Sequence, residues 1–266
     1  MRYTPRPKPD KSLPLKTRLL ENGVFWMVAF LLLIGAILYT PEILEASHAY
    51  QDREFPIYCV QTPKKQVAIS FDAAWGNEDT QNILDILKRH DVKVTFFMTG
   101  GWVSQYPEDV KQIVSQGHDL GNHSENHKNM SQLTPAQIRE ELLTVHHRVK
   151  QLTGVEMDLF RPPYGDYDND VIAVARECGY YPIQWDVDSL DWKDYGTDSI
   201  IETVVSHPHL GNGSIILMHN GAKFTPEALE AVITGLQENG YELVPISQLI
   251  YRERYHVDHE GRQIPD

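Results

Sequence analysis

The sequence predicts an α/β domain with a largely parallel sheet, open or closed into a barrel, behind one N-terminal transmembrane helix. Two observations predict it: β-prone runs alternate with helical runs along most of the chain, and one long uncharged stretch lies near the start. The chain has 266 residues, 41% of them hydrophobic and 23% charged. This is globular composition, with room for one ordinary domain and an anchor.

The predicted anchor comes first. Residues 1–22 form a basic segment with six Lys/Arg against two acids, and 20 residues without a charge run from Asn22 to Pro41. At about 1.5 Å per residue this run matches a bilayer core of about 30 Å, so we predict a transmembrane signal-anchor helix over 23–40. The positive-inside rule places the N-terminus in the cytoplasm and the domain outside the cell, as a single-pass protein of the cell membrane.

Two alternatives to the anchor are a buried core helix and a cleaved signal peptide. Ser47-His48-Ala49 offers small residues for cleavage, but it lies ten residues beyond Tyr39 and the basic segment is unusually long. The length of the uncharged run and its basic flank argue against a core helix. An uncleaved anchor is therefore favoured.

The remainder is predicted as a linker over 41–62, a folded domain over 63–252 and a polar tail over 253–266 that ends in a frayed terminus. Within the domain, a helix begins at Thr134 with a capping box closed by Gln137, and it stops at Gly154. Other helices are expected around 83–87, 110–114 and 225–240, and strands over 67–71, 92–97, 180–185, 215–218 and 243–244.

Charge and motifs exclude several classes of function. The chain carries a net charge of −13, and without the basic start the rest is more acidic still, so we expect no nucleic-acid binding. No GxGxxG follows a strand and no P-loop lysine motif is present, so we expect no nucleotide. Cys59 and Cys178 are too few for a disulfide scaffold or a Cys-rich zinc site; they could pair, or Cys178 could be a buried free thiol.

Several polar residues follow predicted strands, where parallel α/β folds carry their catalytic groups. Asp72 follows the strand 67–71, and His219 ends the strand that starts at Ile215. Each also has a structural interpretation: Asp72 as a turn or helix-capping residue, and His219 as a satisfied core histidine rather than a general acid.

Three further segments have the same two interpretations. His123 and His127 are spaced to share one side of a helical turn and bind a metal, or they are surface histidines. Two prolines stiffen the segment that holds Arg161 and Tyr164, which is either functional or a structural turn. One acid of the segment 186–191 could orient a histidine, although a solvated loop is the commoner meaning.

Together and in this order, the five segments resemble a polysaccharide deacetylase with a NodB homology domain, carbohydrate esterase family 4. The resemblance covers roughly Lys65 to Leu249, and the segments 70–80 and 189–192 look most like the PdaB-like, sporulation-type branch. The resemblance implies an irregular (β/α) barrel of about seven parallel strands.

The resemblance also implies a metal-assisted amide hydrolysis. Asp72 matches the general base that takes a proton from the attacking water, and Arg161 matches the arginine that pairs with it. His123 and His127 match the two metal-binding histidines. The physical chemistry fits, because an amide oxyanion needs a cation and a fixed hydrogen-bond donor.

The remaining roles concern the oxyanion and the leaving group. The resemblance implies that the backbone N–H at Tyr164 contacts the oxyanion, that Asp191 orients a histidine, and that His219 is the general acid. The amine is a poor leaving group unless it is protonated as the C–N bond breaks, and His219 would supply that proton.

One position departs from the family pattern. The usual second aspartate of the first motif, a metal ligand, is Ala73 here, and catalytic zinc commonly takes three protein ligands. Asp72, or Glu78 or Asp79 from a folded-back loop, could complete the site; otherwise zinc, cobalt or manganese would bind weakly, or not at all. Asn220, where many relatives carry aspartate, is a milder change.

The sequence thus predicts a membrane-anchored extracytoplasmic N-deacetylase of peptidoglycan or a related cell-wall polysaccharide. The alternatives are a glycan-binding homologue that is catalytically weak or inactive because of Ala73, and an O-acetyl esterase. Aromatic residues that could stack on sugar rings, or belong to the core, are Trp75, Trp102, Tyr164, Trp192 and Tyr195.

Overall fold

The computed structural model describes residues 25–34 and 53–266. Residues 25–34 form a helix inside the predicted anchor, while the rest of the predicted span and the possible cleavage site at Ser47-His48-Ala49 lie outside the described residues. No helix among the described residues has the length and apolar character needed to cross a membrane. The second compact unit, Glu54–Asp266, carries all the other elements and is called the body below.

The main sheet of the body has the strand order β6-β5-β4-β3-β2-β8-β7, with β9 beside β2, and every pairing in it is parallel. The prediction of about seven parallel strands is therefore confirmed. The strands are β2 (Gln66–Ala73), β3 (Thr95–Met98), β4 (Asp119–Asn122), β5 (Leu159–Phe160), β6 (Tyr181–Pro182), β7 (Val187–Asp188), β8 (Ile215–His219) and β9 (Glu242–Leu243).

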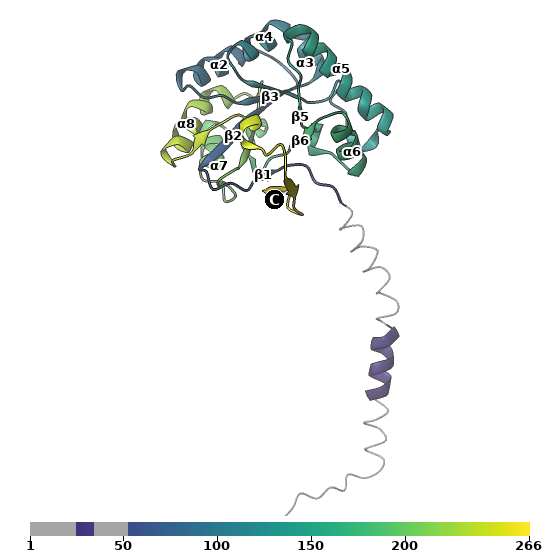
Figure 1. Ribbon diagram of the computed structural model, residues 1–266. Helices are drawn as coiled ribbons and strands as arrows, with labels where there is room; N and C mark the ends of the chain where they lie inside the picture. The colour runs from purple at the N-terminus through teal and green to yellow at the C-terminus, as the bar shows by residue number, and fades with distance from the viewer. Residues whose placement is uncertain (1–24, 35–52) are drawn as a thin grey trace, which may run out of the picture. The chain divides into compact units, whose positions relative to one another are not determined.

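Helices surround this sheet in an arc, as Figure 1 shows for α2 to α6 and α8. The capping box of Thr134 and Gln137 is present, and Gly154 ends that helix with the left-handed backbone that glycine tolerates. The helices are α2 (Thr80–Arg89), α3 (Gly100–Gln105), α4 (Pro107–Ser115), α5 (Pro135–Thr153), α6 (Asn169–Glu177), α7 (Thr197–Val205), α8 (Thr225–Glu238) and α9 (Ile246–Leu249), with short 3-10 turns η1 (Met130–Gln132), η2 (Pro163–Gly165) and η3 (Asp191–Lys193).

The barrel is not closed, because β6 and β7 stand at opposite ends of the strand order. Each has only two residues, and Pro182 in β6 has no N–H to donate. The outer edge of β6 instead exchanges hydrogen bonds with Ile57, whose N–H donates to Pro182 O at 2.8 Å and whose carbonyl accepts from Gln184 N at 2.7 Å. The sheet is a half-barrel whose open edge is covered by the N-terminal segment of the body.

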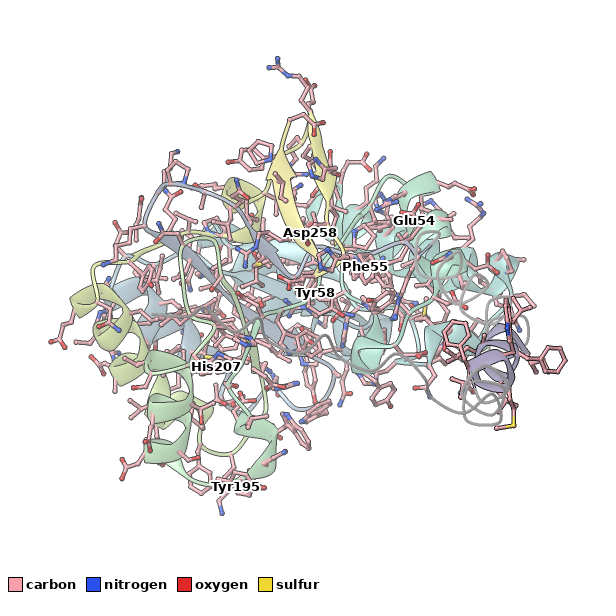
Figure 2. The ribbon with its side chains drawn as sticks, turned by 90° about the horizontal axis from the view of Figure 1, so that it is seen from below. Glu54, Phe55, Tyr58, Tyr195, His207 and Asp258 are labelled. Carbon is pink, nitrogen blue, oxygen red and sulfur yellow. The ribbon has the colours of Figure 1, made fainter. Side chains whose placement is uncertain are left out.

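The two chain ends of the body correct the predicted boundaries. The expected frayed tail forms a hairpin of β10 (Tyr255–Val257) and β11 (Arg262–Pro265), and β11 pairs in parallel with β1 (Cys59–Val60) inside the expected linker. Polar composition misled the prediction, because backbone hydrogen bonds stabilise this sheet. One of them joins Tyr58 N–H to Gly261 O at 2.8 Å, and Figure 2 shows Tyr58 close to Asp258 of the hairpin.

The cysteines do not form a disulfide. Cys59 is buried, Cys178 is half-buried, and both are free thiols. Burial raises the pKa of Cys59 to about 12, so this thiol stays protonated and unreactive at neutral pH. Of the two interpretations, the free thiol is confirmed.

Candidate active site

The register of the sheet brings the predicted residues to one edge. Asp72 lies opposite His219 across β2 and β8, at the carboxyl ends of both strands. His123 follows the last residue of β4, and Arg161 follows the last residue of β5. Neighbouring parallel strands end at the same edge, so residues almost 150 positions apart in the sequence meet there.

Asp72 and Arg161 form a buried ion pair. The Nη1 of Arg161 donates to Oδ1 of Asp72 at 2.7 Å, and its Nη2 donates to the Ser70 hydroxyl at 2.8 Å. Arg161 is fully buried, and its guanidinium lies 4.2 Å from the centre of the Phe97 ring. Burial alone would raise the pKa of Asp72, but the charge and hydrogen bond of Arg161, together with the neighbouring His123 and His219, outweigh burial and the pKa is lowered.

His123 is oriented by the backbone that carries Arg161. Its Nδ1 is 2.8 Å from the carbonyl of Arg161, which can only accept, so Nδ1 carries the proton and Nε2 is left bare in the neutral ring. Nε2 lies 3.5 Å from Oδ2 of Asp72. Burial lowers the pKa of His123 to about 4, so the ring is neutral at pH 7.

His127 reaches the same edge, but not by the expected helical turn. Residues 123–127 form a non-helical loop in which Ser124 and His127 both have left-handed backbones, with φ of 66° and 53°. The two imidazole rings are 5.0 Å apart between centroids. The two rings therefore lie close together, but a loop brings them there rather than the predicted helical turn.

The position of the missing aspartate is buried and supplies no ligand. Ala73 is fully buried, and Glu78 and Asp79 do not replace its carboxylate: Glu78 accepts from the Asn77 N–H, and both oxygens of Asp79 accept from the Gly221 N–H. Asp72 is the acid nearest to His123. Over residues 25–34 and 53–266, no three His, Cys, Asp or Glu side chains are grouped closely enough to hold a metal ion.

The residues predicted for the acid role form a tight pair. Oδ1 of Asp191 lies 2.7 Å from Nδ1 of His219, and its Oδ2 accepts from the His219 N–H at 2.7 Å and from Thr225 Oγ1 at 2.6 Å. Burial alone would lower the pKa of His219, but the hydrogen bond and charge of fully buried Asp191 raise it. One carboxylate therefore fixes both the backbone and the ring of His219.

Asn220 explains part of how the edge is held. Its carbonyl oxygen accepts from the Thr80 hydroxyl at 2.9 Å and its amide donates to Gly76 O at 3.2 Å. These bonds tie the loop after β2 to the end of β8. A structural role for Asn220 follows, in keeping with its place outside the assigned chemistry.

Asp72, His123, His127 and His219 line one cavity of about 500 Å³. Tyr164 lies at its rim with an exposed ring and a left-handed backbone of φ 60°, a conformation that costs energy for a non-glycine residue. Trp185, Asp188 and Leu217 also line the cavity and were not singled out, although Asp188 belongs to the acid-rich segment already noted. The residues that line the cavity are Asp72, Trp75, His123, His127, Tyr164, Trp185, Asp188, Trp192, Leu217 and His219.

Known proteins with similar sequences indicate which family carries this arrangement of residues. Residues 60–183 match the family model for polysaccharide deacetylase. The chain is 39% identical to the uncharacterized protein YlxY of Bacillus subtilis over 75% of its own length and 61% of that protein's length. It is 34% identical to the peptidoglycan-N-acetylmuramic acid deacetylase PdaA of the same organism, over 74% and 75% of the two chains.

A solved structure adds a contrast. BA3943 of Bacillus anthracis, described as a CE4 family pseudoenzyme, is 38% identical with a TM-score of 0.70, over 73% of this chain and 68% of that one. A mutant of the same protein is described as having restored enzymatic activity. The similarity in sequence, fold and order of site residues shows that the chain belongs to the polysaccharide deacetylase (NodB homology) family, carbohydrate esterase family 4, whose named members include peptidoglycan deacetylases.

Proposed function

We propose that this chain binds an N-acetylated cell-wall glycan and hydrolyses its acetamide group. One observation carries the proposal: Asp72 and His219 line one cavity from the adjacent strands β2 and β8, and a buried partner holds each of them, Arg161 for Asp72 and Asp191 for His219. A base and an acid on opposite sides of a bound amide are what hydrolysis of a C–N bond requires. Relatives named as peptidoglycan deacetylases support the choice of glycan.

The proton transfers follow from the hydrogen bonds. Arg161 occupies Oδ1 of Asp72, so Oδ2 is the oxygen that can take a proton from an attacking water. The Nδ1–H of His219 donates to Asp191, so Nε2 is the atom that can protonate the departing amine. Water then adds to the carbonyl carbon, the C–N bond breaks, and acetate and a sugar amine are released.

The residues in place do not form a complete metal site. His123 presents a bare Nε2 as a ligand would, and His127 lies beside it, but Ala73 adds nothing and no group of three donors is assembled among the described residues. We therefore derive no step through a metal ion. Members of this family are generally metal-dependent. Loss of a residue that only supports a metal ligand typically costs about 10- to 100-fold in affinity or activity, and loss of the ligand itself should cost at least as much, so slow hydrolysis is expected.

A second candidate function is glycan binding without hydrolysis. The lack of a carboxylate at the buried Ala73 favours it, and so does the description of BA3943 as a pseudoenzyme. The two paired carboxylates argue the other way, since a binding site needs neither a base nor an acid. An O-acetyl esterase would use the same groups on a different bond.

Acetate release decides between these functions. The full chain is incubated with peptidoglycan, with N-acetylglucosamine oligomers and with an O-acetylated glycan, in chelator and with added zinc, cobalt or manganese. Acetate from the N-acetylated substrates that disappears in His219→Ala is the expected result. Glycan binding with no acetate from any substrate would overturn hydrolysis and leave the binding function; acetate from the O-acetylated glycan alone would indicate an esterase.

For the location of the protein, we propose that the N-terminal segment anchors the body to the outer face of the cell membrane. The uncharged run, its basic flank and the apolar helix over 25–34 support this proposal. Fractionation of cells before and after carbonate extraction tests it. Recovery in the soluble fraction would argue for a cleaved signal peptide instead.

A further inference from the structure

Gln184 is a buried residue that lies outside the five segments singled out from the sequence. Its exposed fraction is 1%, and it comes two residues after the end of β6. The residue before it, Ile183, donates its N–H to the Phe160 carbonyl at the end of β5, at 2.7 Å. Because Arg161 follows β5 directly, the parallel pairing of β5 with β6 brings Gln184 beside Arg161 and the turn after it.

The backbone of Gln184 contacts Arg161. Its carbonyl accepts from Nη2 of Arg161 at 3.2 Å, and the same nitrogen also donates to the Ser70 hydroxyl. In the part of the chain that the structure describes, Nε of Arg161 has no hydrogen-bond partner. The guanidinium is therefore oriented through its two terminal nitrogens, and the Gln184 carbonyl is one of the acceptors that orient it beside Asp72.

The side chain of Gln184 holds the turn that carries Tyr164. Its Nε2 donates to the Gly165 carbonyl at 3.1 Å. The left-handed backbone of Tyr164 costs energy and persists only while surrounding contacts hold it. At the next residue, Asp166 accepts from the N–H and the hydroxyl of Ser131, at 2.9 and 2.8 Å. Two distant parts of the chain thus hold this turn at consecutive residues.

Gln184 is itself held in place. Its N–H donates to the Ile57 carbonyl at 2.7 Å, in the N-terminal segment that covers the open edge of the half-barrel. With its N–H, its carbonyl and its side-chain amide all bonded, the residue is fixed before any substrate binds. Groups that are fixed in advance need no reorganisation when charge develops in a transition state.

We propose that Gln184 is a positioning residue of the active site. Its amide holds the turn so that the Tyr164 backbone N–H, which the family resemblance assigns to the oxyanion, stays in position, and its carbonyl orients Arg161 beside the base Asp72. Gln184 contacts no reacting atom and acts through these two residues. The proposal rests on the proposed hydrolysis and adds to it a residue that the sequence motifs do not contain.

Gln184→Met tests this role, because methionine fills a similar volume and cannot donate to the Gly165 carbonyl. In acetate release by the full chain from N-acetylglucosamine oligomers, we expect kcat to fall by about 3- to 10-fold, the effect of one lost hydrogen bond. KM should stay nearly unchanged, since the oxyanion forms only in the transition state. Thermal melting checks folding. Gln184→Asn, whose amide is one methylene too short to reach Gly165, should give the same result and replaces Gln184→Met if that variant does not fold.

The Tyr164 ring supplies a second measurement that needs no turnover. Its centroid lies 4.5 Å from that of the His127 ring, and the two rings meet edge to face. The ring current of the tyrosine therefore shifts the imidazole proton signals of His127 in NMR spectra. Tyr164→Ala gives the signal positions without that ring, and Gln184→Met should move the signals part of the way towards them. Spectra at about pH 8 keep the His127 ring neutral, because burial lowers its pKa below the ordinary value of about 6.5.

Gln263→Met is the matched control. Gln263 is also a buried glutamine whose amide bonds to a backbone: it accepts from the Tyr251 N–H and donates to the Tyr251 carbonyl, both at 2.8 Å. It lies in β11 and is not among the residues that line the active-site cavity. This variant should lose stability without a change in kcat or in the His127 signals.

A Gln184→Met chain that matches the control in kcat and in the His127 signals would overturn the positioning role, and so would a raised KM with kcat unchanged. Failure of hydrolysis is a separate result. If the chain releases no acetate but Gln184→Met still moves the His127 signals, the proposed enzyme is refuted and the positioning of the turn is supported. Acetate release that Gln184→Met leaves unaffected would support the enzyme and refute the role of Gln184.

Discussion

His123, which follows β4, and His219, which ends β8, line the same cavity, and burial lowers the pKa of both, yet their pKa values shift in opposite directions. Asp191 overcomes burial at His219 and raises its pKa. His123 faces a backbone carbonyl and an Asp72 that Arg161 already neutralises, so burial prevails and its pKa falls to about 4. The partner, rather than depth in the protein, decides the charge of each ring.

The surroundings of His219 and those of His123 and His127 also differ in whether every expected partner is present. Around His219, both carboxylate oxygens of Asp191 are engaged: one pairs with the imidazole Nδ1, and the other accepts from the His219 N–H and the Thr225 hydroxyl. His123 and His127 lack the carboxylate that Ala73 replaces, but each keeps a hydrogen bond that positions it. The Arg161 carbonyl accepts from the His123 ring, and the Ser124 hydroxyl accepts from the His127 N–H. The loss of one ligand at Ala73 therefore leaves His123 and His127 in position.

The largest expected effect is on hydrolysis itself. Asp72→Asn removes the oxygen that takes the proton, and we expect acetate release to fall by at least about 100-fold while the chain stays folded. Asp188→Asn is the matched control, because Asp188 lines the same cavity and its carboxylate accepts from the Leu190 N–H. An equal loss in both variants would remove Asp72 from the base role.

Restoring the missing carboxylate beside the two histidines should have the next largest effect, on metal affinity. Ala73→Asp adds a carboxylate next to His123 and His127, and affinity for zinc should rise by about 10- to 100-fold in calorimetric titration. Without metal, the buried charge should lower the melting temperature, and zinc should restore it. Ala74→Asp, one residue further on and less buried, serves as control. Identical titrations of all three chains would mean that these groups do not share a site.

Removing the partner of His219 should make the two histidines alike. In Asp191→Asn the pKa of His219 should fall below its ordinary value, as measured by NMR titration of the imidazole signals, while the pKa of His123 should remain near 4. A His219 pKa that stays raised would assign its charge to some other group.

The same change predicts a pH dependence of stability. The folded-state pKa of His219 is raised, so the folded chain holds this proton more tightly than the unfolded chain. The stabilisation is complete below the ordinary histidine pKa of about 6.5 and is lost as pH rises through the folded value. Denaturant unfolding should therefore show the largest difference from Asp191→Asn under mildly acidic conditions, and a smaller one at alkaline pH.

The smallest expected effect concerns Trp75, whose ring contacts both His219 and His127. Trp75 stacks on His219 with 5.8 Å between centroids and meets His127 edge-on at 6.3 Å. Trp75→Ala should reduce acetate release by a few-fold through looser positioning of His219, since such a contact is worth about 0.5–1 kcal/mol. Trp75→Phe should recover most of it. Full activity of the alanine variant would show that Asp191 alone positions His219.

Much of the architecture could be predicted from local patterns. The helix from Thr134 to Gly154 is defined by its cap, its periodicity and its terminal glycine, all within the segment itself. Strands β2 and β8 were found because each contains a short, mostly apolar β-prone run, 67–71 in β2 and 215–218 in β8. The short strands β5 and β7 and the hairpin β10–β11 were missed, because two to four residues form a strand only when a distant partner supplies the hydrogen bonds.

The sequence by itself determined the family, the order of the site residues and the absence of a carboxylate at Ala73. Tertiary structure decided that Glu78 and Asp79 bond elsewhere and that the pKa values of His219 and His123 shift in opposite directions. The physical reason is range. Helix caps and strand alternation depend on neighbours in the chain, whereas a pKa or a ligand set depends on groups that only folding brings within a few ångströms.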